Sequence, residues 1–312
     1  MDLITEEIIR ALFRIEAIRR AIGRLVSGAV DVPVAYMEGL SERIRSDNAA
    51  RRAITSEVAD AVREKVKEDP AVIQRGLDRW TRQLGEKQRT REEIGIRTLG
   101  VLAEGEVPIG AAAPTEDFMR AFEDMAEKVS SAEMMDLMAR ILAGEVRKPG
   151  SVSRRTLAIV PVLDKEILST LAKVRSYLLH GDWVHVPPSA ARERRHDFAL
   201  LSSVSITSEV SVRTLGFRDG SAIIKIGPKA LLLILQPSAK TWFMDGAHLT
   251  PIGQELVSLL PFPAEDKITE IALGFKEYSF VEKVSVGKIV EEEGEPKVVD
   301  ATEVIVSRTS LI

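Results

Sequence analysis

The sequence contains no cysteine. This absence excludes disulfide bonds, thiol nucleophiles and zinc sites with cysteine ligands, and it is typical of a reducing compartment, so we expect a cytoplasmic protein. No run of about 18 apolar residues occurs, and we therefore expect no membrane-spanning helix. The most apolar run, KALLLILQP at 229–237, predicts a buried strand instead. The N-terminus is acidic and then amphipathic, a pattern that differs from that of a signal peptide.

Motifs of common catalytic sites are absent as well. The four histidines, His180, His185, His196 and His248, do not form a metal-ligating pair on one predicted helix, and the sequence has no HExxH motif. It also has no phosphate-binding loop, no GxGxxG motif and no GxSxG nucleophile motif. We therefore expect no cofactor, no metal site and no enzymatic activity. A metal-dependent nuclease built from loosely spaced carboxylates and a lysine stays an open alternative.

What is present suits a globular protein with packed cores. Hydrophobic residues make up 45% of the 312 residues, and this length suggests two domains. The net charge of −4 is mild, which argues against a dedicated polyanion-binding protein but permits a local basic patch.

Residues 1–104 read as long helices. Residues 4–27 place apolar side chains at helical spacing, and residues 41–68 carry a thin stripe of small residues. A thin stripe suits helix–helix pairing better than a globular core, so we predict an oligomerisation region here. The basic helix at 4–27 could also lie on a membrane surface, but it has few aromatic anchors. A charged helix at 71–104 completes the region.

A linker and a compact helical core are predicted next. The linker, GEVPIGAAAPTED at 105–117, is rich in Gly, Ala and Pro, and we place a domain boundary there. The core at 118–180 is expected to contain helices at 116–129, 132–146, 153–162 and 164–179.

Residues 181–312 have a mixed α/β pattern. Predicted strands lie at DWVHV, SAIIKIG and ALLLIL, and predicted helices lie at 207–220, 248–261 and 265–276. Two β-rich runs then flank EEGEP as a terminal β-hairpin. The expected fold class is α+β: a long helical N-terminal region, a compact helical core, and a winged-helix-like α/β part with a C-terminal β-hairpin.

The strongest local signal is ARILAGEVRKPGSVSRRTL at 139–157. A helical pattern stops at Pro149-Gly150 and restarts with Ser151 or Ser153 as N-cap. Two arginines in the new first turn oppose the helix dipole, so they need anionic neighbours. The candidate anion or partner surface consists of Arg140, Arg147, Lys148, Ser151, Arg154 and Arg155.

Two explanations of this corner stay open. Glu145 or Asp164 could form internal ion pairs with the arginines, or a phosphate could bind at the helix start. In the first case the corner is an architectural hinge with Glu145 paired to an arginine. Its expected buried residues are Leu142, Leu157, Ile159 and Val160.

A second, weaker basic cluster is ARERRHDF at 191–198, with Arg192, Arg194 and Arg195 as candidate binding residues. We expect a charged loop there. Because Trp183 and Phe198 are its only aromatic flanks, stacking on single-stranded nucleic acid is disfavoured.

Residues 125–166 resemble the core signature of a bacterial family catalogued as domain of unknown function 2806. The matching elements are Leu142-Ala143-Gly144-Glu145, Pro149-Gly150-Ser151 and Arg155-Thr156-Leu157. The helix EKQRTREEIGIRTLGVLAEG and the later segments RTLGF and LTPIGQEL resemble further elements, so the resemblance covers roughly residues 75–275. The family has no assigned catalytic residues. The resemblance implies a bacterial, prophage or mobile-element context and a role in phage defence or host–phage conflict.

Two functions follow as hypotheses. The first is a non-enzymatic interaction or sensor protein that forms a homo-oligomer through its N-terminal helices and recognises a protein partner with its C-terminal half. The second is a nucleic-acid-binding regulator in which residues 207–260 form a winged-helix-like unit and the basic corner contacts phosphates.

Overall fold

The computed structural model describes residues 6–27, 70–108, 111–185, 191–216, 220–227, 229–237, 241–260, 267–292 and 295–304. The chain divides into two compact units, residues 1–161 and residues 162–312. The first unit is helical, and the second contains antiparallel sheets and ends in a β-hairpin, so the fold class is α+β as the sequence predicts. The predicted linker at 105–117 lies within the first unit.

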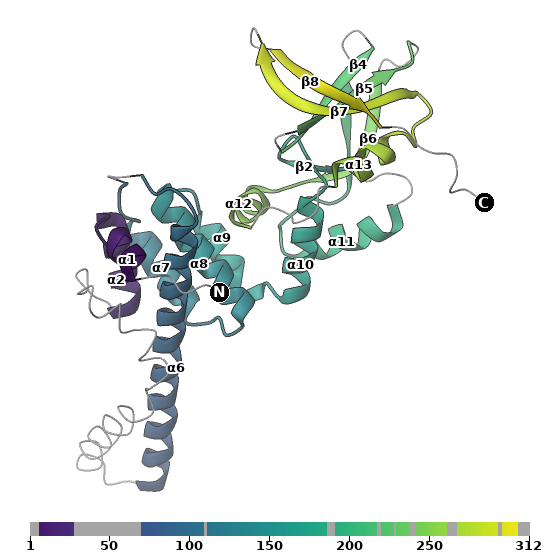
Figure 1. Ribbon diagram of the computed structural model, residues 1–312. Coiled ribbons are helices and arrows are strands. Elements are labelled where there is room, and N and C mark those ends of the chain that lie inside the picture. Colours follow the sequence, from purple (N-terminus) through teal and green to yellow (C-terminus); the bar gives the residue numbers. More distant parts are fainter. Residues whose placement is uncertain are drawn as a thin grey trace. The chain divides into compact units, whose positions relative to one another are not determined.

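The first unit is assembled around one long helix, α6, which contacts α1, α2, α7 and α8 (Figure 1). Its elements are α1 (Glu6–Leu12), α2 (Glu16–Ser27), α6 (Pro70–Ala103), α7 (Glu116–Ala126), α8 (Ala132–Arg147), α9 (Arg154–Ile159) and the 3₁₀ turn η1 (Val160–Val162). The predicted helices that begin at 71, 116 and 132 are therefore confirmed.

One predicted helix of this unit is divided. Residues 4–27 form α1 and α2 rather than a single helix, because the chain tightens between them. The Arg14 and Ile15 N–H groups donate to the carbonyls three residues earlier, which is the 3₁₀ pattern. No proline or glycine marks this break. Residues 28–40 and the predicted helix at 41–68 lie outside the described residues.

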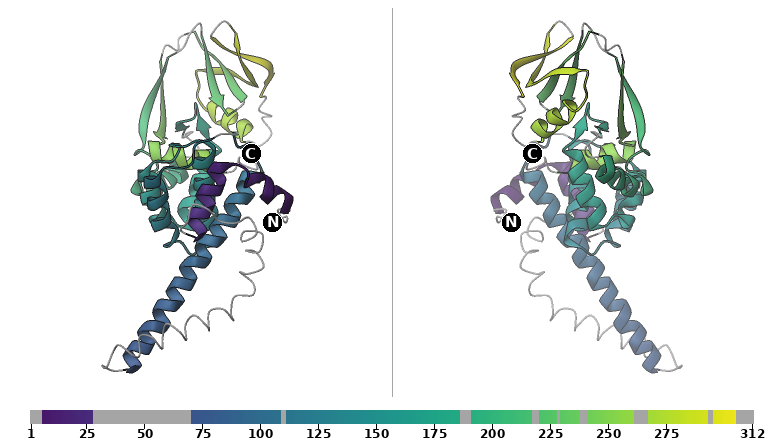
Figure 2. Two further views of the ribbon diagram at one scale, coloured as in Figure 1. Left: turned by 90° about the vertical axis from the view of Figure 1, so that its left-hand side faces the viewer. Right: turned by 90° about the vertical axis from the view of Figure 1, so that its right-hand side faces the viewer.

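The core of the first unit lies around the C-terminal part of α6. Ile94, Leu99 and Leu102 of this helix are buried, together with Ile22 of α2 and Phe122 of α7. The N-terminal part of the same helix extends away from α7 and α8 (Figures 1 and 2). The long helix thus has a buried part and an exposed part.

Helix starts follow the capping rules that the sequence displays. The side chains of Thr115, Ser131, Ser153, Asp164 and Thr250 each accept a hydrogen bond from a backbone N–H three residues further on. This is the reason that these helix starts are visible in the sequence.

The second unit contains four helices and eight strands among its described residues. They are α10 (Lys165–Arg175), β1 (Leu178–Leu179), β2 (Trp183–His185), α11 (Ala191–Ser203), β3 (Ser211–Gly216), β4 (Ser221–Ile226), β5 (Lys229–Leu235), β6 (Thr241–His248), α12 (Pro251–Leu259), α13 (Ile268–Phe275), β7 (Val281–Glu292) and β8 (Glu295–Glu303).

The strands form two antiparallel four-stranded sheets. One has the order β1-β2-β6-β3 and the other the order β4-β5-β7-β8. The apolar run predicted as a buried strand is β5, in the interior of the second sheet, and β7 with β8 forms the predicted hairpin.

The short helix predicted within 207–220 is wrong, because residues 211–216 form β3. Each of these six residues pairs with a residue of β6, and this tertiary pairing outweighs the local helical pattern. The prediction of a winged-helix-like unit at 207–260 was based partly on this helix, which is absent. That prediction stays unconfirmed.

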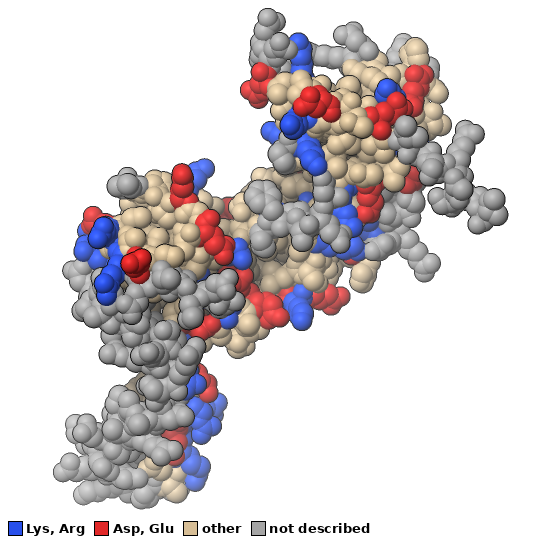
Figure 3. Space-filling model, in the orientation of Figure 1, with Lys and Arg blue, Asp and Glu red and all other residues tan. Residues whose placement is uncertain are grey.

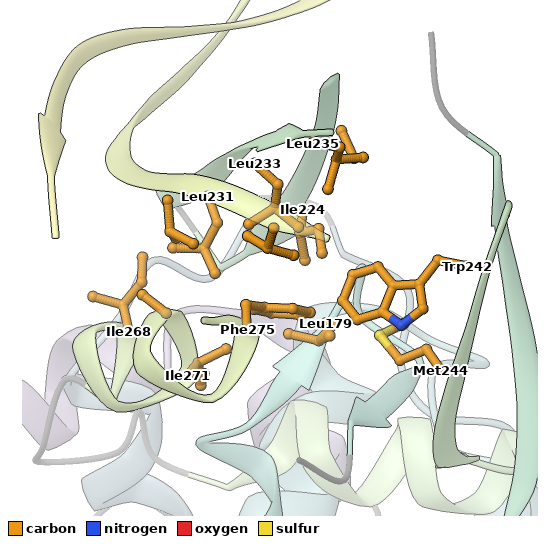
Figure 4. Packing of buried hydrophobic residues seen from close by; sticks show 14 of the residues in the cluster. Leu179, Ile224, Leu231, Leu233, Leu235, Trp242, Met244, Ile268, Ile271 and Phe275 are labelled. Carbon is orange, nitrogen blue, oxygen red and sulfur yellow. The ribbon is translucent and has the colours of Figure 1, made fainter. Parts of the chain in front are cut away.

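The core of the second unit is aromatic at its centre. Phe275 of α13 lies among Leu179, Ile224 and Trp242 (Figure 4), and its ring centroid is 5.2 Å from that of Trp242. Close packing also fixes Gly246 in β6, since a Cβ there would lie 2.3 Å from the carbonyl oxygen of Val184.

Candidate functional site

The basic corner is organised by a buried carboxylate. Glu145 is 2% exposed, and its side chain accepts hydrogen bonds from the backbone N–H groups of Gly150, at 2.7 Å, and Val152, at 3.2 Å. Gly150 has a φ of +81°, a conformation that glycine adopts without a steric penalty. The prediction that Glu145 pairs with an arginine is therefore wrong, because backbone donors of the turn occupy its carboxylate.

Burial around the corner follows the hinge interpretation closely. Leu142, Leu157 and Val160 are buried as predicted, whereas Ile159 is half-buried. Ser153 is the N-cap of α9, and its Oγ accepts from the N–H of Thr156 at 3.3 Å. The Oγ of Ser151 is buried and has no hydrogen-bond partner among the described residues.

Two of the candidate arginines have partners within the first unit. Arg140 Nε lies 3.1 Å from Asp136 Oδ2, one turn earlier on α8. Arg147 Nη2 donates to the Val101 carbonyl of α6 at 2.6 Å and covers Gly105. Burial lowers the pKa of Arg147, and the charge of Glu104 partly offsets this effect. Arg140 thus forms an ion pair within α8, and Arg147 joins α8 to α6.

The other candidates of the corner lie on the surface. Arg154 Nη2 is 2.7 Å from Asp117 Oδ2, in the first turn of α7, and both side chains are exposed. The sequence pointed to Glu145 or Asp164 as the anionic neighbour, and the structure provides Asp117 instead. Lys148 and Arg155 are exposed and have no ion pair within the described part of the chain. The exposed cations of the corner are thus Lys148, Arg154 and Arg155.

The second basic cluster is not a loop but the start of helix α11. Arg194 is buried, and its guanidinium carbon lies 3.4 Å from the centroid of the Tyr177 ring. Arg195 is exposed, and the side chain of Arg192 lies outside the description. Preceding prolines and dense charge concealed the helix, although Arg194, Phe198 and Leu201 are buried at helical spacing. The three arginines therefore do not form one surface.

Sequence reasoning missed a buried polar cluster in the second unit. His185 Nδ1 lies 3.1 Å from the Asp245 carbonyl and therefore donates to it, so Nε2 accepts from the Tyr278 hydroxyl at 3.4 Å. The imidazole stacks on Phe275, with centroids 5.0 Å apart. Burial lowers the pKa of His185 to about 4 and raises the pKa of Tyr278.

Neither group of this cluster exchanges a proton near neutral pH, because the imidazole stays neutral and the phenol stays protonated. Its members come from segments far apart in the chain, so no local pattern could have revealed them. The cluster therefore contributes to the packed core of the second unit.

A half-exposed network lies at the other end of β2. Asp182 Oδ1 accepts from Arg213 Nη1 at 3.1 Å, and Asp182 Oδ2 lies 3.5 Å from His248 Nδ1. The nearby Ser208 Oγ accepts from the backbone N–H of His248 and donates to the Glu209 carbonyl. Because the backbone occupies this hydroxyl, the network is not arranged as a nucleophile with its base.

A hydroxyl-lined hollow of about 420 Å³ lies between α11, the segment before β3, and α12. Its lining residues are Ala199, Ser202, Ser203, Ser205, Thr207, Glu209 and Thr250. Ser202, Ser203 and Thr250 donate to nearby backbone carbonyls, so their hydroxyls do not converge on a common point. The hollow is polar but not organised for one ligand.

Among the described residues, neither the distribution of charged side chains nor the placement of possible metal ligands indicates another binding site. Lys and Arg side chains are interspersed with Asp and Glu side chains over the face shown in Figure 3. No group of three His, Asp or Glu side chains among the described residues could hold a metal ion. In the same part of the chain, no helix has the length and apolar character needed to cross a membrane.

Exposed apolar side chains remain as the clearest surface feature. Trp80 and Leu84 are exposed on α6, and Val212 and Phe243 are exposed on β3 and β6. Exposed aromatic and branched side chains that lie together are typical of protein contact surfaces.

Comparison with known proteins gives one match. Residues 74–181 match the family described as "Protein of unknown function (DUF2806)", which includes the corner and about a third of the chain. The match ends before RTLGF and LTPIGQEL, so the resemblance of these later segments to the family stays an unconfirmed prediction. Neither the curated proteins nor the solved structures contain a match. The buried Glu145 turn thus lies within the matched segment, and residues 74–181 of this chain are similar to the DUF2806 family.

Proposed function

We propose that this protein is a non-enzymatic interaction protein that self-associates through the exposed part of α6. The observation that carries the proposal is an apolar seam formed by Leu77, Trp80 and Leu84, which we call the α6 seam. Trp80 is 51% exposed, Leu84 is also exposed, and Leu77 is half-buried. Their spacing of three and four residues is that of the contact line between paired helices.

The rest of α6 explains why this part is available. From Ile94 onward the helix packs into the first unit, with Ile94, Leu99 and Leu102 buried, whereas the α6 seam precedes that packing. Thr81 and Gln83, which flank the seam, are polar and uncharged. A second helix could therefore pack there without bringing like charges together at these positions.

The proposal has a second part, in which the second unit recognises a protein partner. Phe243 supports it, because an aromatic ring exposed on a sheet gains much by being covered. A sensing role in conflict between bacteria and phages follows from the family resemblance alone.

The test is the mass of the full chain in solution, measured by light scattering at micromolar concentration. Wild type is expected to be an oligomer, and Trp80→Glu combined with Leu84→Glu is expected to lower its mass. Arg82→Glu is the matched control, since it changes a charge between the two positions but on the opposite, exposed face of the helix. A monomeric wild type, or an unchanged mass of a folded double variant, would contradict the proposal.

A second candidate function, nucleic-acid binding, is favoured by the exposed cations of the corner. Lys148 and Arg155 have no ion pair within the described residues, and Arg154 pairs only at an exposed position. Binding through them would weaken with salt, with a log–log slope of about −0.9 per phosphate contacted on duplex DNA. Arg154→Glu with Arg155→Glu would abolish such binding, and salt-independent binding would argue against this function.

A further inference from the structure

The α6 seam has two borders that differ in exposure and in charge. On one side of Trp80, Leu77 and Thr81 are half-buried, whereas on the other side Arg79 and Glu86 are exposed. Successive helical residues are turned by about 100°, so two residues seven apart lie within about 20° of each other around the axis. Arg79 and Glu86 therefore lie on the same border, two turns apart. The accessible part of the seam is displaced toward this border.

Within the described residues, Arg79 and Glu86 have no ion-pair partner. Asp78, the acidic residue next to Arg79, instead accepts a hydrogen bond from Gln74 at 2.8 Å. One cation and one anion are thus available along the exposed border of the α6 seam.

We propose that two copies of this chain pair their α6 seams in antiparallel orientation, with Arg79 of each copy bound to Glu86 of the other. This inference rests on the proposed self-association through α6 and specifies how the two helices are oriented. A two-fold axis level with the midpoint of the two residues, between Arg82 and Gln83, exchanges the copies and forms two identical ion pairs. Because the border is complementary in charge to itself, a second copy is the occupant that it fits.

The same register lets the apolar side chains interdigitate. Trp80 precedes the two-fold axis by about 4 Å along the helix, and Leu84 follows it by about 2 Å. Trp80 of one copy therefore packs against Leu84 of the other, so that a large ring meets a smaller side chain and not a second indole. Further along α6, Lys87 and Arg91 bind Glu127 of the first unit. The contact is accordingly confined to the turns around the axis, where the two helices cross.

A parallel arrangement offers no such ion pairs. In a parallel pair each border of one helix faces the opposite border of its partner, whereas in an antiparallel pair each border faces its own counterpart. The opposite border contains Leu77 and Thr81, which are uncharged and half-buried. Arg79 and Glu86 would then face no opposite charge. The distribution of charge therefore favours the antiparallel orientation.

Charge reversal in the full chain tests the ion pairs. Arg79→Glu and Glu86→Arg are each expected to weaken self-association about tenfold, because two attractive contacts become repulsive. The combined variant Arg79→Glu, Glu86→Arg restores opposite charges and is expected to assemble like wild type. An equimolar mixture of the two single variants is also expected to assemble, since one copy then supplies two acidic residues and the other two basic residues. Light scattering over a dilution series measures these differences, and Arg82→Glu is the control that is expected to behave as wild type.

The charge variants also separate this inference from the proposal on which it rests. Single variants that assemble like wild type would overturn the antiparallel orientation, and so would a combined variant that stays as weak as the single ones. If Trp80→Glu with Leu84→Glu still lowers the mass in either case, self-association through α6 stands and only its orientation is wrong. A monomeric wild type would overturn both.

The absence of cysteine allows an independent measurement of orientation. Val72→Cys places a single thiol at a position that is 53% exposed, and a nitroxide label there reports the distance between the two copies by electron paramagnetic resonance. Antiparallel helices are expected to separate the two labels by about 30 Å, because the rise of about 1.5 Å per residue accumulates along both helices. A distance below about 20 Å would indicate parallel helices, whose axes lie about 10 Å apart, and would overturn the inference.

Discussion

The two units bury a charged side chain in opposite ways. In the first unit, Glu145 gives both carboxylate oxygens to backbone N–H groups of the turn that follows α8. In the second unit, Arg194 stacks on Tyr177, and its Nη1 is buried with no hydrogen-bond partner among the described residues. Burying a charge costs free energy, and the hydrogen bonds and ion pairs of the buried group determine how much of that cost is offset. The comparison predicts that the two residues differ sharply in their contribution to stability.

The largest expected effect is that of Glu145→Ala. Removing the carboxylate leaves two N–H groups without their acceptor, and the free energy of unfolding of the first unit should fall by about 4 kcal/mol. Glu145→Gln keeps one acceptor oxygen and should cost about half as much. Chemical denaturation measures both, and Glu106→Gln, at an exposed position, is the control. A loss below about 1 kcal/mol for Glu145→Ala would show that the turn does not depend on this carboxylate.

A somewhat smaller effect is expected at His185. Its folded pKa of about 4 lies below the usual value of 6.5, so the unfolded chain binds the proton more readily between these pH values. Stability from this group is therefore fully present above pH 6.5 and is lost as the pH falls toward 4, by about 3 kcal/mol in total. In His185→Phe this part of the pH dependence should disappear. Denaturation of both proteins at pH 7, 5.5 and 4 gives the comparison, and equal slopes would contradict it.

The smallest effect is expected for Arg194→Met. The flexible methionine can fill much of the same space, and the cost of burying a poorly satisfied charge disappears together with the contact to Tyr177. The free energy of unfolding should change by about 1 kcal/mol or less, in either direction. Thermal unfolding measures the change, and a loss as large as that of Glu145→Ala would reverse the comparison.

The sequence was sufficient for elements that local chemistry specifies. Thr115, Ser131 and Thr250 are N-cap residues and indicate where helices start. The apolar run of β5 indicates a strand in the interior of a sheet. Tertiary contacts decided the rest. β3 is a strand because it pairs with β6, and the break between α1 and α2 has no breaker residue.

The sequence predicted where the basic corner lies, but it did not predict which groups its charged side chains contact. Its basic residues were evident, but the acceptor role of Glu145 depends on backbone donors that exist only after the turn forms. Asp117 reaches Arg154 through the packing of α7 beside α9, which no local spacing encodes. The buried cluster around His185 was invisible for the same reason, since its aromatic residues come from separate elements.

The α6 seam precedes the part of α6 that packs into the first unit. A two-fold pairing through this seam uses the same surface on both copies, so it is complete with two molecules and leaves no seam exposed for a third. Dilution would then act as a switch, because it returns each molecule to a state in which Trp80 is again exposed to water.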